Sequence, residues 1–166
     1  MRSWADGQAL AVPAPRARAI ATAATEGVEA ARAGDPEAFG AAAGRLAEFN
    51  PEQIRLVLGA VVRALLEDQH ADGLTGDDVQ AALGRCVRSA IAWFPDLDVN
   101  VLIVLVTGAL GVHPEEGEIA APAPLAVAQH ATLLVSDLVT AADRPLHGYL
   151  AASLAEIARA ETMEMP

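Results

Sequence analysis

The sequence predicts an all-α protein: a compact bundle of about six or seven helices around an apolar central helix at residues 99–111. Three helix-start signals carry this prediction, Asp35-Pro36-Glu37, Asn50-Pro51-Glu52 and Thr75-Gly76-Asp77-Asp78. In each signal a short polar side chain can accept from the unpaired N–H groups of the first helical turn, and proline suits the first helical position. Apolar residues then follow at helical spacing. We expect one helical domain over residues 14–163, preceded by a flexible segment at residues 1–13.

The first two helices are predicted at residues 15–33 and 36–49. The first is rich in alanine and has only Ile20 and Val28 as large aliphatic residues, so it can pack closely but buries little apolar surface. Gly34 is the expected stop, because glycine favours the residue that follows a helix. The second helix places one apolar face toward the core, made of Phe39, Ala42, Ala43 and Leu46.

The third helix begins after Asn50 and has the clearest amphipathic pattern in the chain. Its apolar face comprises Ile54, Val57, Leu58, Val61, Val62, Leu65 and Leu66. The opposite face, here called the polar strip, comprises Arg55, Gly59, Arg63 and Glu67. After Gly73 a fourth helix starts at a capping box and runs to Phe94 before Pro95. Since a short loop joins the third and fourth helices, we expect them to form an antiparallel hairpin.

Residues 99–110 are apolar on every face and rich in β-branched side chains. A strand at 99–106 is the alternative, but a lone strand would leave its backbone groups without sheet partners. We therefore predict a helix that is capped by Asp98 and ends near Gly111. A surface loop or arm follows at 111–124, and two further helices are predicted at residues 125–142 and 145–163.

Composition excludes several classes of protein. The chain has 166 residues, 11 basic and 22 acidic side chains, a net charge of −11 and no lysine. A nucleic-acid partner is not expected, because both molecules would be negatively charged. The single cysteine, Cys86, cannot form an internal disulfide. No segment has a signal-peptide pattern or the length of about 20 apolar residues that a membrane helix needs. We expect a cytoplasmic protein without membrane contact.

Candidate metal ligands are few. The loop from Asp68 to Gly73 resembles the opening of an EF-hand at Asp68 and Asp72, but it has His70 at the third position and Val79 where the closing glutamate should stand. His130 and His147 lie on successive predicted helices and could converge with Asp137 or Glu156. The simpler expectation is that the histidines are partly exposed surface residues and that Cys86 is a packed core residue.

We assign no catalytic residue and predict no cofactor. The chain has no G-x-S-x-G nucleophile elbow and no phosphate-binding loop of the G-x-x-x-x-G-K-[ST] type, and a pair such as Glu26 and Glu29 has no evident second pair to share a magnesium ion. An apolar pocket near residues 93–110 is the candidate ligand site, because few large side chains are present to fill an alanine-rich core. Its candidate lining residues are Trp93, Phe94, Asn100 and Tyr149.

These features predict a non-enzymatic protein that acts through protein–protein contact, as an adaptor, inhibitor or immunity-type partner. Its acidic surface and the polar strip would engage a basic protein partner. A small-molecule-binding domain is the alternative, followed by a carboxylate- or metal-dependent enzyme. We also expect a homodimer, since the first helix and residues 99–110 offer more weakly polar surface than one small core consumes.

Overall fold

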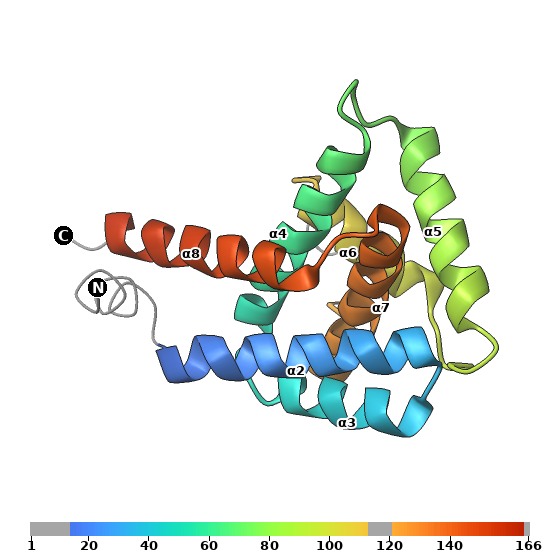
Figure 1. Cartoon of the computed structure of the whole chain (residues 1–166), viewed down its shortest axis with the longest axis horizontal. Coiled ribbons are helices and arrows are strands. Elements are labelled where there is room, and N and C mark those ends of the chain that lie inside the picture. The colour runs from blue at the N-terminus through green and yellow to red at the C-terminus, as the bar shows by residue number, and fades with distance from the viewer. Residues whose placement is uncertain (1–13, 113–120, 165–166) are drawn as a thin grey trace.

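The computed structural model describes residues 14–112 and 121–164, and within these ranges the chain forms seven helices and no strand (Figure 1). The helices are α2 (Ala14–Ala33), α3 (Pro36–Ala47), α4 (Pro51–Gln69), α5 (Gly76–Ala90), α6 (Val99–Ala109), α7 (Pro124–Ala142) and α8 (Leu146–Glu164). The all-α prediction is confirmed, including a helix at 99–106. The predicted flexible segment at 1–13 and most of the predicted loop at 111–124 lie outside the described residues.

The helix starts follow the predicted caps. The side chains of Asp35, Asn50 and Asp98 each accept a hydrogen bond from a backbone N–H in the first turn of the helix that follows. Thr75 and Asp78 form a complete capping box at the start of α5, with bonds of 3.0 and 3.2 Å. Each cap satisfies donors that the helix itself leaves unpaired.

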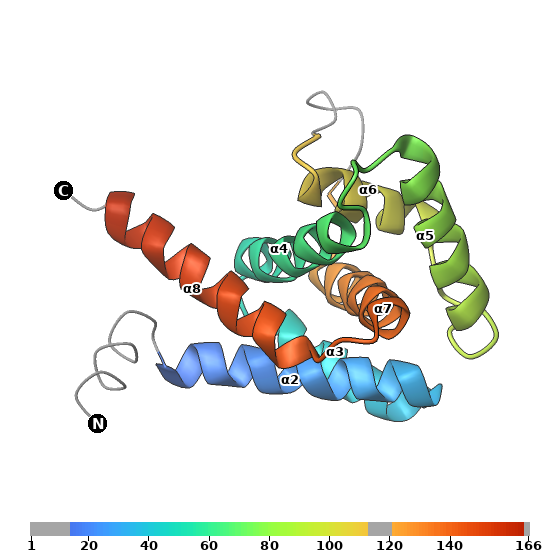
Figure 2. The same ribbon diagram turned by 45° about the horizontal axis from the view of Figure 1, so that its top comes forward.

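Helix α7 lies in the middle of the bundle and contacts α2, α3, α4, α5 and α6 (Figures 1 and 2). The expectation that no segment has the length and apolar character of a membrane helix is wrong for α7, the one such helix in the described part of the chain. However, 61% of its apolar window is buried inside the protein. Such burial is typical of the core helix of a soluble bundle. The apolar helix α6 packs on α4, α5 and α7 through Leu102, Leu105 and Val106, while Val99 and Ile103 on its other side are exposed.

The expected hairpin of the third and fourth helices is wrong. Helices α4 and α5 diverge from their connecting loop, and α5 packs on α7 instead (Figure 2). Small buried residues of α5 allow this contact, and Arg85 fixes it, with Nε 2.9 Å from the Asp137 carboxylate of α7. Helix α5 also ends earlier than predicted, at Ala90, because residues 91–93 form a turn before Phe94 and Pro95.

At Gly27, helix α2 packs closely against α3 and α7. A Cβ atom added at this glycine would lie 2.9 Å from the Thr132 methyl carbon of α7 and 3.5 Å from Ala42 Cβ of α3. Real Cβ atoms do not come that near to a carbon atom. The absence of a side chain at position 27 therefore sets how closely the three helices can pack.

Helix α8 lies across α4. The buried Ser153 hydroxyl of α8 donates to the Val57 carbonyl of α4 at 2.7 Å, and Tyr149 Oη donates to Asp68 at 2.8 Å. A third bond, from Gln69 Nε2 to the Leu138 carbonyl, holds the end of α4 to α7 at 2.9 Å. None of these contacts covers the outward face of α4, which lies between α8 and α6.

Candidate functional site

Trp93 and Phe94 fill space rather than line a cavity. Their rings lie 5.1 and 5.5 Å from the Phe39 ring, both edge to face, a favourable geometry for aromatic pairs. The indole N–H of Trp93 donates to the Ser89 carbonyl at 3.1 Å. Trp93 and Phe94, which were predicted to line a ligand pocket, therefore pack in an aromatic cluster between α3 and the end of α5.

The other two predicted pocket residues lie elsewhere. Asn100 is exposed in the first turn of α6, and Tyr149 is half-buried on α8 and bonded to Asp68. The structure therefore does not bring Trp93, Phe94, Asn100 and Tyr149 around one pocket. For Tyr149 the sequence could not show this, because its distance from the other three residues depends on where α8 crosses the bundle.

The four weak metal candidates are not grouped either. Asp68 accepts from Tyr149, Asp72 is exposed in the turn after α4, and His147 is exposed on α8. In residues 14–112 and 121–164, no group of three or more His, Cys, Asp or Glu side chains is placed to hold a metal ion.

His130 lies in the core, so the expectation of a surface histidine is wrong at this position. It is 2% exposed. Its Nδ1 lies 2.8 Å from the Ala126 carbonyl, and its Nε2 accepts the backbone N–H of Asp98 at 2.9 Å. Both ring nitrogens are therefore engaged, which requires the neutral imidazole with the proton on Nδ1. Burial lowers the pKa of His130, against the opposing effects of the Ala126 bond and the Asp98 carboxylate.

A partly buried ion pair lies between α5 and α7. The side chain of Asp137 is 8% exposed, and Arg85 Nη2 lies 2.9 Å from its carboxylate. Burial raises the pKa of Asp137, while the bond and charge of Arg85 oppose that change. The pair tethers α5 to α7.

Cys86 is packed in the core beside this pair, as predicted. Desolvation, helped by the Asp137 charge, raises the pKa of its thiol to about 12. Because the thiolate is the reactive form, we expect native Cys86 to resist the thiol reagent DTNB at neutral pH, and to react at once in guanidinium chloride. Rapid stoichiometric reaction of the folded protein would contradict this burial.

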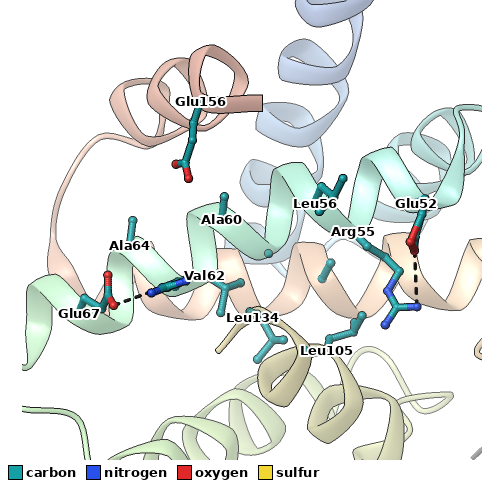
Figure 3. A pocket seen from close by; sticks show the side chains of 15 residues that line it. Glu52, Arg55, Leu56, Ala60, Val62, Ala64, Glu67, Leu105, Leu134 and Glu156 are labelled. Atoms are coloured by element: carbon teal, nitrogen blue, oxygen red, sulfur yellow. Dashed lines mark hydrogen bonds and ion pairs between the residues drawn. The ribbon is translucent and has the colours of Figure 1, made fainter. Parts of the chain in front are cut away.

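An open groove of about 670 Å³ runs along the outward face of α4, between α8 and the C-terminal half of α6 (Figure 3). Leu56 lies in it and is 58% exposed, so an apolar side chain stands open to solvent within the groove. Beside Leu56 the helix surface is made of small residues, which are Gly59, Ala60 and Ala64. The far wall comes from Leu105, Gly108 and Ala109 of α6, and Glu156 of α8 stands on the opposite side.

The charges along the groove are mostly paired within α4. Arg63 Nε donates to Glu67 at 3.2 Å, and Arg55 Nη1 lies 3.9 Å from Glu52 (Figure 3). Exposed pairs of this kind contribute little to stability, so a bound partner can exchange them at low cost. Glu156 points from α8 toward α4 and forms no ion pair with any described residue. The groove therefore offers one unpaired carboxylate beside an apolar floor.

The sequence identified part of this groove. All four residues of the polar strip, Arg55, Gly59, Arg63 and Glu67, line it. Leu56 was missed, although its signal is present, since it is the one leucine of α4 outside the amphipathic face. The chain itself matches no protein-family model, no curated protein and no solved structure.

Proposed function

We propose that this protein is a non-enzymatic interaction module, and that its α4 groove binds a basic amphipathic helix of a partner protein. One observation carries the proposal: Leu56 stands 58% exposed at the head of an open groove of small residues. Exposed apolar surface in a concave, polar-rimmed setting is typical of binding sites. An adaptor, inhibitor or immunity-type role follows from binding alone, without a cofactor or a catalytic residue.

The shape of the groove favours a helix as the ligand. Its lining from Glu52 to Glu67 follows about four turns of α4, or about 22 Å at 1.5 Å per residue. Gly59, Ala60 and Ala64 let a second backbone come close to α4, and Leu56 can insert between the apolar side chains of the incoming helix. Recognition through an apolar stripe in a groove is a recurring mode of helix binding.

Charge favours a basic partner. Glu156 has no counter-charge among the described residues, and the whole chain carries −11. A lysine or arginine of the partner would form an ion pair with Glu156 at the groove. The negative net charge of the chain would also raise the rate at which a basic partner associates. The same field opposes nucleic acid as a partner. We place the protein in the cytoplasm, where the single thiol of Cys86 stays reduced.

Substitution of Leu56 tests the proposal. The probe is a fluorescein-labelled amphipathic peptide of leucine, alanine and lysine, about 18 residues long, so that it spans the groove. We expect Leu56→Glu to weaken binding about tenfold or more, because it removes apolar contact worth about 1.5 kcal/mol or more and places a charge on the floor. Fluorescence anisotropy of the full chain measures the affinity.

The matched control is Leu125→Glu on α7. This leucine is 45% exposed and does not line the groove, and the variant has the same net charge as Leu56→Glu. We expect its affinity for the peptide to equal that of the parent chain. Equal affinity of both variants would mean that the peptide binds only to the general acidic surface, and the proposed site would be rejected.

A small organic ligand is the second candidate, because a volume of about 670 Å³ lies within the range of ligand pockets. Native mass spectrometry of the freshly purified protein distinguishes the two candidates. A retained organic mass that disappears in Leu56→Glu would favour the ligand, and a ligand-free chain that binds the peptide would favour the partner helix.

A further inference from the structure

The outer face of α6 is mostly apolar and partly exposed within the described part of the chain. It consists of Val99, Asn100, Ile103, Val104 and Thr107, on the side of α6 opposite its buried residues Leu102, Leu105 and Val106. Val99 is 46% exposed and Ile103 is 41% exposed. Two exposed β-branched residues one helical turn apart form a ridge, the kind of surface that packs into the grooves of another helix.

The polar groups of this face need few hydrogen bonds from a partner protein. The Thr107 hydroxyl donates to the Ile103 carbonyl within the helix at 2.8 Å, so its hydrogen is already used. Asn100 lies at the rim, in the first turn. No charged residue occurs between positions 99 and 112. A protein surface can therefore cover this face without burying an unpaired charge.

We propose that this face binds the same face of a second copy of the chain. Two copies that each carry −11 repel one another over most of their surfaces. The α6 face is a region where two acidic copies can meet without placing like charges in contact. A basic partner, in contrast, finds no counter-charge there and is better served by the α4 groove. An uncharged face therefore lets two acidic copies meet through apolar contact alone.

The size of the face limits the strength of the dimer. Helix α6 has 11 residues and is about 16 Å long. A standard interface buries about 800 Å² on each partner, more than a single short helix offers. We therefore expect dissociation in the micromolar range and a two-fold arrangement, with α6 packed against its copy.

The dimer leaves the α4 groove open. Leu105, Gly108 and Ala109, through which α6 lines the groove, lie on the sides of the helix away from Val99 and Ile103. Each dimer would then present two grooves, so a partner with two basic helices would bind with an avidity that a single groove cannot supply. The dimer does not depend on the groove function, and either proposal can fail alone.

Sedimentation velocity of the full chain tests the dimer. We expect the dimer fraction to rise between about 1 and about 500 µM protein, by mass action. We also expect it to rise between about 0.05 and about 0.5 M NaCl, because salt screens the repulsion between the copies. A basic partner in the groove should show the opposite salt dependence. A monomer at every concentration, or a dimer that salt dissociates, would overturn the proposal.

Two variants locate the interface. Ile103→Glu and Asn100→Glu each place a charge on the outer face, and both should shift dissociation about tenfold or more toward monomer. Asn100 is exposed in the first turn of α6, where glutamate suits the helix dipole, so Asn100→Glu keeps the fold even if Ile103→Glu does not. Leu125→Glu carries the same added charge on an exposed leucine of α7 and should dimerise as the parent does. Equal dimerisation of all three variants would place the interface elsewhere.

Discussion

Gly27→Leu is expected to lower the free energy of unfolding by about 3 kcal/mol, because overfilling a packed site forces side chains and backbone apart. Position 27 lies where α2 meets α3 and α7, and even a Cβ atom there would be 2.9 Å from the Thr132 methyl carbon. Thr132 cannot easily turn away, since its hydroxyl donates to the Ala128 carbonyl at 2.7 Å. The gain in helix propensity over glycine, about 0.8 kcal/mol, offsets only part of the loss.

Urea denaturation measures this effect, and Gly40→Leu is its control. Gly40 is an exposed residue inside α3, and a Cβ atom there would meet nothing within 4 Å. The same change should therefore stabilise the protein by about 0.5–1 kcal/mol through helix propensity. Opposite signs at the two glycines are the expected result. Stabilisation by both would show that α2 is free to move away from α7.

The second large effect is expected at His130. His130→Ala should cost about 3 kcal/mol, since it opens a cavity beside Phe94, whose ring lies 5.7 Å from the imidazole, and leaves the Asp98 N–H without its acceptor. His147→Ala, at an exposed histidine of α8, should change stability by less than about 0.5 kcal/mol. A small loss at His130 would mean that water replaces the ring and accepts the Asp98 bond.

His130 also makes stability depend on pH. Its pKa in the fold is lowered from the ordinary value of 6.5, so the unfolded chain binds the proton more readily. The contribution of the neutral ring is complete above pH 6.5 and is lost as the pH falls below it. Urea titrations between about pH 7.5 and about pH 5 should show a steeper loss in the parent than in His130→Ala. Asp78, whose pKa is lowered by its bonds to Thr75, loses its contribution only in more acidic solution.

Much of the fold could be predicted because its signals are local. A cap and the residues that it serves lie within four positions, so Asp35, Asn50 and Thr75 mark their helices without reference to the rest of the chain. The hairpin of α4 and α5 failed for the opposite reason. A short loop keeps two helix ends near each other, but it does not fix the angle between the helices, and the surface of α7 competes for α5 through Asp137.

The candidate site was only partly predictable, because its walls come from helices that are distant in the sequence. Periodicity placed the polar strip on the outward face of α4, yet a groove also needs walls, and these come from α6 and α8, which lie far along the chain. His130 shows the limit most clearly. Its sequence neighbours suggest nothing unusual, and its burial follows from the way α7 passes the first turn of α6, where the Asp98 N–H lies.

The place of α7 in the chain order affects how the protein can be made. Five helices bury against α7, but it begins only at Pro124, after all of them have been synthesised. Helices α2 to α6 therefore leave the ribosome before the surface on which they assemble exists. Their apolar faces cannot pack on α7 until α7 has been synthesised, so the native domain assembles at a late stage of translation. Until α7 is made, α2 and α3 can pack on each other, but the faces of α2 to α6 that contact α7 in the native domain have no partner in the chain.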